Sequence, residues 1–290
     1  MNWMRQRLLY FIISLTVIGA GLFGFFKWGF LFGVDFKGGS ILEYRFEKQI
    51  SEEEIAQEIK KEGYQVTAIQ KTREKTYLIR TSGETKDARK LDEVLKKSTG
   101  GGVENLRLES VGPSIGPELI KKTVYALLIA SLGILIWISI QFRSFKFGVS
   151  ATLATFHDSL VLLGSFSLLG HFFGAEVNFL FVTAVLTVLS FSVHDTIVVY
   201  DRIRESQKKI GGSLYDLANR AISETMVRSL NNSFTIIFML IALVLLGGST
   251  IKWFAVALLI GTISGTYSSP FVAVPLLVTW DEIEKKIKKA

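Results

Sequence analysis

The sequence predicts a membrane protein in which an all-α bundle of six transmembrane helices carries one α+β extracytoplasmic domain. The 290-residue chain has a mean hydropathy of +0.37 and 49% apolar residues, yet 20% of its residues are charged, and the charges are clustered. A spanning helix needs about 20 apolar residues. Six stretches meet this requirement, at 8–32, 122–141, 148–170, 177–200, 229–247 and 253–279. The segment 38–112 between the first two has the composition of a soluble domain.

The first span reads as an uncleaved anchor, because its apolar region is too long for a signal peptide and no small-residue cleavage site follows Phe32. Lys and Arg cluster before this span, between spans two and three and between spans four and five, and again at 285–289. By the positive-inside rule these segments are cytoplasmic. The predicted organisation is a cytoplasmic N-terminus (1–7), the first transmembrane helix (8–32), an extracytoplasmic domain with connectors (33–119), a five-helix transmembrane region (120–280) and a cytoplasmic basic tail (281–290). The net charge of +7 follows from this bias, so nucleic-acid binding is not predicted.

The soluble segment has the pattern βαββαβ of a ferredoxin-like split unit. Strands are predicted at 41–46, 64–71, 76–81 and 103–109, and helices at 51–63 and 84–98. Ser51 and Glu54 form a capping-box pattern at the start of the first helix. The segment contains no Cys or His and no phosphate-binding glycine loop. The fold hosts many functions, so it does not identify this one.

Two glycine-containing connectors join this domain to the membrane. In GVDFKGG, which begins at Gly33, the two glycines Gly38 and Gly39 permit a tight turn with positive φ, and Asp35 could cap this turn or pair with Lys37. The motif lacks the spacing of a phosphate-binding loop.

The connector VGPSIGPEL contains Gly112, Pro113, Gly116 and Pro117. Its prolines disfavour helix and predict an extended, stiff segment. A plain linker and a hinge that lets the outer domain move both remain open.

Two His-Asp pairs lie inside predicted spans: His157-Asp158 in the third and His194-Asp195 in the fourth. An ionised group at this depth costs roughly 2.5–3.5 kcal/mol on insertion scales, so such residues are usually functional. Adjacent residues on a helix diverge by about 100°, which disfavours a metal site. We expect Asp195 to carry a proton. For His157 and Asp158, a buried structural role and a part in proton relay both remain open.

The fifth span opens with Arg228, followed by Asn231 and Asn232. Arg228 could be a positive-inside anchor that reaches the lipid headgroups. Alternatively, the three side chains point inward toward Asp195. A nearby cation and burial have opposite effects on the proton affinity of a carboxylate, so such a site could load and release a proton near neutral pH.

The last span carries Gly261, Gly265 and Ser269 at a spacing of four, which is suited to close helix packing. No nucleophile–base pair, metal-ligand cluster or nucleotide motif stands out in the sequence. Neither an enzyme nor a cofactor is therefore predicted.

The segments GVDFKGG, VGPSIGPEL, FHDSL and VHDTIVVYDRIRE together resemble the SecF family, the membrane subunits of the bacterial SecDF complex. The resemblance implies half of an RND-type transporter, with SecD supplying six further spans and a larger outer domain. It implies a complex in the plasma membrane that uses the proton gradient to help draw unfolded preproteins out of the SecYEG channel. The family's fourth-span aspartate falls on Asp195 and its fifth-span arginine on Arg228. Two departures are His194, where the family usually has Asn, and Lys37, where a small hydroxyl residue is common. His194 adds a titratable group next to Asp195 and is therefore included among the proton-relay candidates.

Two other functions are compatible with the sequence. A self-contained RND-like exporter of lipids or drugs would need homodimerisation and normally has two larger outer domains, whereas this chain has one small domain. A non-transporting membrane assembly factor would use the outer domain for docking, and Asp195 would then be structural.

Overall fold

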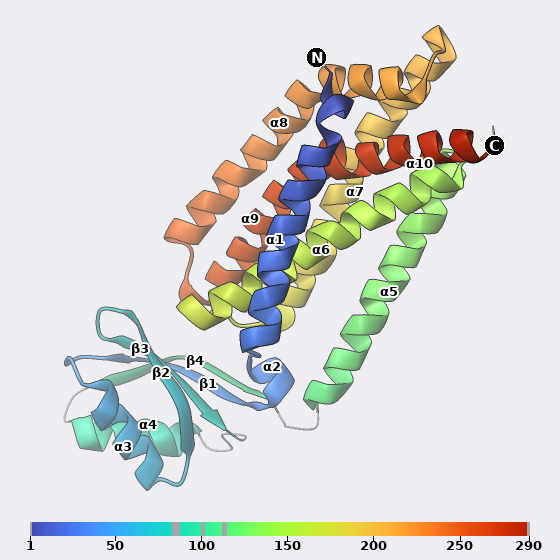
Figure 1. The fold of residues 1–290 in the computed structure, drawn as a ribbon. Helices are drawn as coiled ribbons and strands as arrows, with labels where there is room; N and C mark the ends of the chain where they lie inside the picture. Colours follow the sequence, from blue (N-terminus) through green and yellow to red (C-terminus); the bar gives the residue numbers. More distant parts are fainter. Residues whose placement is uncertain (1, 83–87, 100–101, 112–114, 289–290) are drawn as a thin grey trace. The chain divides into compact units, whose positions relative to one another are not determined.

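The computed structural model describes residues 2–82, 88–99, 102–111 and 115–288. The chain divides into two compact units, one formed by Met1–Leu31 with Tyr125–Ala290 and the other by Phe32–Val124. Figure 1 labels the elements. Those of the outer unit are α2 (Val34–Lys37), β1 (Gly39–Phe46), α3 (Glu52–Lys61), β2 (Gln65–Arg73), β3 (Thr76–Ser82), α4 (Ala88–Thr99) and β4 (Val103–Val111). Those of the membrane unit are η1 (Trp3–Gln6), α1 (Arg7–Trp28), α6 (Phe145–Phe173), α7 (Phe179–Ile210), α8 (Leu214–Leu246), α9 (Ser249–Ser268), η2 (Ser269–Ala273) and α10 (Val274–Ile287). Helix α5 (Ile115–Gln141) begins in the outer unit and continues into the membrane unit.

The outer unit contains an antiparallel sheet with strand order β2-β3-β1-β4. Helices α3 and α4 lie on the same face of this sheet (Figure 1), and their side chains Ile55, Ile59, Leu91 and Leu95 complete its hydrophobic core. The order of elements, β1-α3-β2-β3-α4-β4, is the βαββαβ order predicted from the sequence. The predicted capping box is also confirmed, because Ser51 and Glu54 each accept a hydrogen bond from the backbone N–H of the other.

Six helical segments of the described chain are long and apolar enough to cross a membrane, as predicted. They are Trp3–Trp28, Pro117–Gln141, Phe145–Phe173, Phe179–Ile210, Leu214–Leu246 and Ile251–Ile287. The third, fourth and sixth are the most buried within the chain, so α6, α7 and α9 form the centre of the bundle.

Glycines allow the central helices to approach closely. A Cβ atom at Gly261 would lie 2.0 Å from a Val188 side-chain atom, and one at Gly265 would lie 3.2 Å from Ser192, so α9 packs directly on α7. The predicted small-residue contact surface of the last span is therefore confirmed. The sequence reasoning missed an equivalent contact, in which a Cβ at Gly21 of α1 would lie 2.7 Å from the Cα of Gly164 of α6.

Two helices differ from the predicted spans. Helix α8 begins at Leu214 rather than at Ser229, because Ser213 caps it by accepting a hydrogen bond from the Asp216 N–H. The last span, predicted as 253–279, is interrupted by the π-helical segment η2 (Ser269–Ala273), after which α10 runs in a different direction from α9 (Figure 1). Single π-helical turns of this kind are frequent at functional sites.

Candidate functional site

The His-Asp pair of α6 is buried at the centre of the bundle. Asp158 is fully buried and His157 is 7% exposed. The carboxylate of Asp158 accepts hydrogen bonds from the hydroxyls of Ser192 at 2.5 Å, Ser264 at 2.6 Å and Ser268 at 2.6 Å. The Nδ1 atom of His157 lies 3.1 Å from Asp158 Oδ1. Both oxygens of this carboxylate are therefore satisfied.

This arrangement connects three helices at one point. Asp158 belongs to α6, Ser192 to α7, and Ser264 and Ser268 to α9. A second polar contact joins α7 to η2: the hydroxyl oxygens of Thr196 on α7 and Ser269 on η2 lie 2.9 Å apart. A buried carboxylate with both oxygens hydrogen-bonded to neighbouring helices gives rigidity to a protein interior. The Asp158 network therefore ties α6, α7 and α9 together.

The sequence reasoning did not identify these three serines. A detectable signal was present, because Ser264 and Ser268 are one helical turn apart in an apolar span and so share a face. Polar side chains on one face of a membrane helix are expected to point into the bundle. Their partner, however, lies on a helix more than one hundred residues away in the sequence.

The His-Asp pair of α7 has a different environment. Asp195 is 3% exposed, yet its Oδ2 atom has no hydrogen-bond partner among the described residues. The Ser229 side chain of α8 interacts with this carboxylate. His194, the preceding residue, is exposed on the surface of the chain. The two residues diverge because successive positions on a helix are about 100° apart.

Of the two alternatives for the start of the fifth span, the structure does not have the inward orientation of Arg228, Asn231 and Asn232 toward Asp195, because all three residues are exposed. Their spacing puts them on one side of α8, whereas Ser229 and Ser233, four residues apart, face the interior. Ser233 is buried and accepts a hydrogen bond from Thr266 of α9 at 2.7 Å. Hydroxyl groups, and not the arginine, therefore face the bundle at this level.

Arg228 instead lines a cavity of about 450 Å³ between α7 and α8. The other lining residues are Val198, Asp201, Arg202, Glu205, Glu224 and Thr225, and Asp195 is not among them. Within this set Arg202 forms ion pairs with Glu205, at 2.6 Å, and with Glu224. Charged residues of both α7 and α8 therefore line the cavity. Val198 lies three residues after Asp195 on α7, so the cavity begins about one helical turn from the buried carboxylate.

The first connector adopts the predicted positive φ angles, with Gly38 at 73° and Gly39 at 126°. Between Gly33 and these glycines the chain forms the short helix α2, with Asp35 in its first turn, which the sequence reasoning did not predict. A Cβ at Gly39 would lie 2.5 Å from the carbonyl oxygen of Thr81, so this position requires glycine for space as well as for φ.

In the second connector, Gly112 and Pro113 lie outside the described residues. The prediction that Gly116 belongs to an extended connector is wrong, because α5 already begins at Ile115. Proline is tolerated in the first turn of a helix, where its missing N–H would have no intrahelical partner. Pro117 therefore does not delay the start of α5. No group of three or more His, Cys, Asp or Glu side chains that could hold a metal ion occurs in the described part of the chain.

Comparison with known proteins identifies close relatives. Residues 90–283 match the family described as "Protein export membrane protein SecD/SecF, C-terminal", and residues 26–50 match the "SecD/SecF GG Motif", which contains the first connector. The protein translocase subunit SecF of Thermobaculum terrenum is 41% identical over 96% of this chain and 93% of that relative. The protein translocase subunit SecF of Anaerolinea thermophila is 38% identical over 98% of this chain and 95% of that relative.

Two solved structures extend the similarity to the fold. SecDF from Thermus thermophilus, a translocon-associated membrane protein, matches with a TM-score of 0.82 and 32% identity over 97% of this chain. SecDF in its super-membrane-facing form matches with a TM-score of 0.73 and 31% identity over 100% of this chain. This chain spans 39% and 40% of the length of those two SecDF chains.

Proposed function

The chain belongs to the SecF family of protein translocase subunits, and we propose that it is a half-transporter in which Asp195 carries the proton that drives secretion. The proposal includes no chemical catalysis and no cofactor. In this proposal the protein couples the movement of protons through the membrane unit to the handling of an unfolded preprotein on the outer side of the membrane.

The observation that supports this function best is the incomplete hydrogen bonding of Asp195. A buried polar atom without a partner is uncommon in native proteins and calls for an explanation. Proton binding provides one, because a protonated carboxyl can donate a hydrogen bond and no longer carries a charge in an apolar environment. The neighbouring Ser229 hydroxyl gives the carboxyl a polar contact in either protonation state.

The exposed polar side of α8 supports a partner subunit. Arg228, Asn231 and Asn232 are exposed on this chain, within a helix that is apolar enough to span a membrane. Charged and polar side chains at this depth normally face protein or water rather than lipid. We propose that SecD covers this side of α8. From this position Arg228, together with the charged residues that line the cavity between α7 and α8, would set the proton affinity of Asp195.

The remaining parts of the proposal follow from the family. SecD is the heterodimer partner, SecYEG is the channel that the complex serves, and unfolded preprotein is the substrate. The chain lies in the bacterial plasma membrane and contacts its lipid, with both termini cytoplasmic and the domain 33–119 outside, and it binds no nucleic acid. Moving one charge across 100 mV supplies about 2.3 kcal/mol, so a few protons per cycle are enough to drive a domain movement.

The test uses vesicles that contain the chain with its partner and channel, and it measures preprotein translocation with and without an imposed proton gradient. Asp195→Asn keeps the shape of the side chain but cannot ionise, so the gradient-dependent increment should vanish while translocation powered by ATP continues. Asp216→Asn makes the same change at the exposed start of α8 and should keep the increment. If Asp195→Asn retains the full increment, Asp195 is structural and the assembly-factor function takes precedence.

A further inference from the structure

Helix α10 follows the π-helical segment η2 and crosses one end of the membrane unit. The preceding helix α9 contains 20 residues. At a rise of 1.5 Å per residue α9 is about 30 Å long, which is the thickness of the hydrocarbon core of a bilayer. In Figure 1 α1 runs along the membrane unit, whereas α10 runs across the end that carries the N-terminus, toward the turn between α5 and α6. Helix α10 is therefore placed to lie along a membrane surface, and α9 is long enough to complete the span without it.

The two halves of α10 have different surroundings. The first half is packed into the hydrophobic core of the bundle through Val274, Leu277 and Val278. In the second half, Trp280 is 36% exposed, Ile283 is 52% exposed and Ile287 is 70% exposed. Their spacings of three and four residues put these side chains on one face of the helix. Phe145, at the start of α6, is 62% exposed, and the centroid of its ring lies 6.5 Å from that of Trp280. These four side chains form an exposed apolar stripe.

The acidic side chains of the second half of α10 are all neutralised within the chain. The ion pairs join Asp281 to Lys146 and Lys285, Glu282 to Arg7, and Glu284 to Lys146 and Lys288. Their N···O distances lie between 2.6 Å, for Glu284 with Lys288, and 3.0 Å, for Asp281 with Lys146. No acidic side chain of this segment is therefore left to neutralise a further cation.

Two basic side chains flank the apolar stripe without an ion pair to any described residue. Arg143 lies in the turn between α5 and α6, two residues before Phe145, and Lys286 is the neighbour of Ile287 on α10. Both residues are exposed. Since the nearby carboxylates are already paired, the surface beside the stripe carries positive charge that the chain does not neutralise.

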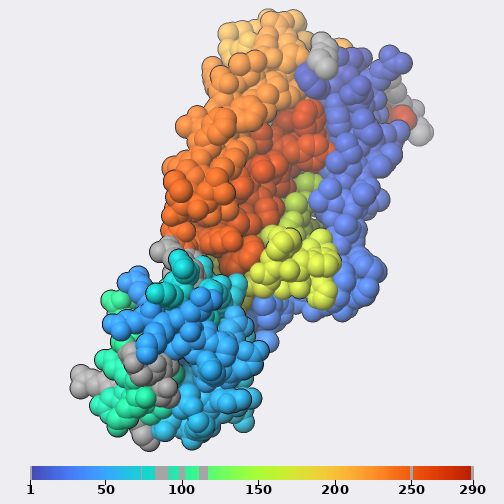
Figure 2. All heavy atoms as spheres, turned by 90° about the vertical axis from the view of Figure 1, so that its left-hand side faces the viewer, coloured from blue at the N-terminus to red at the C-terminus, as the bar shows by residue number. Residues whose placement is uncertain are grey.

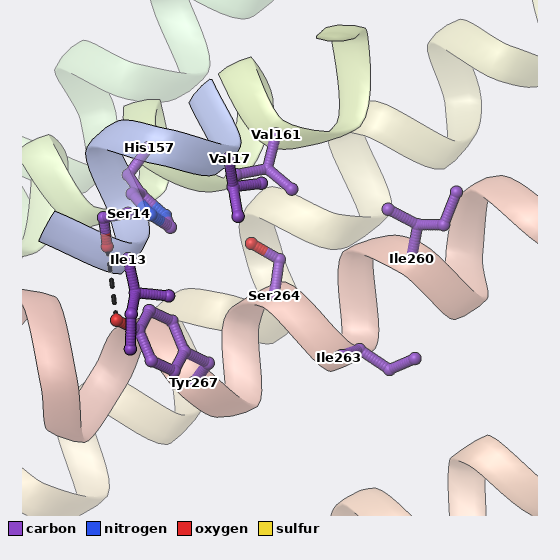
Figure 3. Close-up of a pocket in the computed structure, with 9 residues that line it drawn as sticks. All are labelled: Ile13, Ser14, Val17, His157, Val161, Ile260, Ile263, Ser264 and Tyr267. Carbon is purple, nitrogen blue, oxygen red and sulfur yellow. Dashed lines mark hydrogen bonds between the residues drawn. The ribbon is translucent and has the colours of Figure 1, made fainter. Parts of the chain in front are cut away.

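The exposed surface at the side of the bundle has a different character. In Figure 2 a strip of α6 (yellow-green) is visible between α1 (blue) and α9 (red-orange). The groove between these helices is lined by aliphatic side chains such as Ile13, Val17 and Ile263 (Figure 3), and none of its lining residues is Lys, Arg, Asp or Glu. That surface suits acyl chains alone. The end of α10, in contrast, combines apolar and cationic side chains.

We propose that the second half of α10 lies along the bilayer surface and binds anionic phospholipids. The apolar stripe would lie among the upper parts of the acyl chains, and Arg143 and Lys286 would contact the lipid phosphates. Helices that lie in a membrane surface typically have this combination of a Trp-containing apolar face and flanking basic residues. The stripe lies beside the turn between α5 and α6, whereas the surface proposed for SecD is on α8. The inference goes beyond the proposed function, because it requires neither proton movement nor a preprotein.

The test uses the absence of cysteine from the chain, since a single introduced Cys is then the only labelling site. Ile287→Cys is labelled with bimane in the full-length chain, alone and together with SecD, in nanodiscs that contain phosphatidylcholine and phosphatidylglycerol. Either lipid carries bromine on its acyl chains close to the headgroup, and quenching of bimane reports which lipid occupies the site.

Phosphatidylglycerol should be preferred about fivefold at Ile287→Cys, which corresponds to about 1 kcal/mol for one basic side chain near an anionic surface. Ile129→Cys places the label at an exposed position in the middle of α5, where the preference should be close to one. Arg143→Asn combined with Lys286→Gln should reduce the preference at Ile287→Cys to about one. Asn is chosen because Arg143 has a positive φ of 51°, which Asn tolerates. Lys285→Gln is the matched control, because this lysine already pairs with Asp281, and it should change the preference less than twofold.

Three results would overturn the proposal. The first is equal quenching by the two lipids at Ile287→Cys, or a preference that survives the double variant. The second is a label that neither lipid quenches and that iodide quenches from the water. The third is quenching by lipid that disappears when SecD is added, because a protein surface would then cover the stripe.

Discussion

The third and fourth membrane-spanning helices carry the same dipeptide, His-Asp, in different environments. In α6 both residues are buried, and Asp158 accepts hydrogen bonds from three serine hydroxyls in addition to its contact with His157. In α7 Asp195 is almost as deeply buried, but one of its oxygens has no partner among the described residues, and His194 faces outward. Burial is therefore similar at the two carboxylates, whereas hydrogen bonding is not.

The difference comes from the neighbouring helices. Asp158 meets serines on α7 and α9, so both oxygens of its carboxylate accept hydrogen bonds from well-placed hydroxyl donors. Among the described residues, Asp195 has a side-chain hydrogen bond with Ser229 of α8, the helix on which Arg228 and two asparagines are exposed. A buried carboxylate whose oxygens are all hydrogen-bonded stabilises one conformation of the bundle. A buried carboxylate with an oxygen that lacks a hydrogen bond is stabilised when it binds a proton or a partner group. This contrast supports our proposal that Asp195 carries the proton, and we propose a structural role for Asp158.

The largest expected effect on stability is at Asp158. Asp158→Asn replaces one acceptor oxygen by an NH₂ group opposite serine hydroxyls, and we expect the free energy of unfolding to fall by about 2–4 kcal/mol. Asp195→Asn disturbs no complete network, and we expect a change below about 1 kcal/mol. The measurement is denaturant unfolding of the purified chain in detergent micelles, followed by circular dichroism. Equal losses for the two variants, or a larger loss at Asp195, would remove the distinction between the two pairs.

The sequence alone predicted the parts of the fold that depend on local patterns. Six apolar stretches identified the spans, and the spacing of Ser51 and Glu54 identified a helix start, because each signal is contained within a few turns of chain. The orientation of the start of the fifth span was not predictable in this way. Residues 228–233 read Arg-Ser-Leu-Asn-Asn-Ser, and with polar groups at five of six positions no periodicity indicates which side faces inward.

The surroundings of the candidate site residues were harder to predict than the fold, because they depend on contacts between helices that are far apart in the sequence. Asp195 was identifiable because a carboxylate in an apolar span is conspicuous by itself. The environment of Asp158 was not, since it requires knowing that α6 contacts both α7 and α9 and that their serines meet at one depth. The π-helical segment η2 was likewise unpredicted, because the sequence around Pro270 is also compatible with a continuous kinked helix.

The serines provide a sharper and smaller test of the Asp158 network. Ser192→Ala, Ser264→Ala and Ser268→Ala each remove one hydroxyl donor to a buried carboxylate, and we expect each to lower the free energy of unfolding by about 1.5–3 kcal/mol. Ser165→Ala is the matched control, because this hydroxyl donates only within α6, to the carbonyl of Val161. The same unfolding measurement should show a change within about 0.5 kcal/mol for the control. Losses no larger than that at the three serines would mean that the network contributes little.

The smallest expected effect is at His194. Its side chain is exposed on this chain, so His194→Asn should change the free energy of unfolding by no more than about 0.5 kcal/mol. The gradient-dependent increment of translocation should also persist, because proton binding at Asp195 does not require the imidazole. Retention of the increment would place the whole function of the α7 pair on its carboxylate, in contrast to α6, where His157 contacts Asp158 directly. Loss of most of the increment with unchanged stability would instead make His194 part of the proton relay. That outcome would require the partner subunit to cover the exposed side of α7, because an imidazole open to lipid has no proton donor or acceptor within reach.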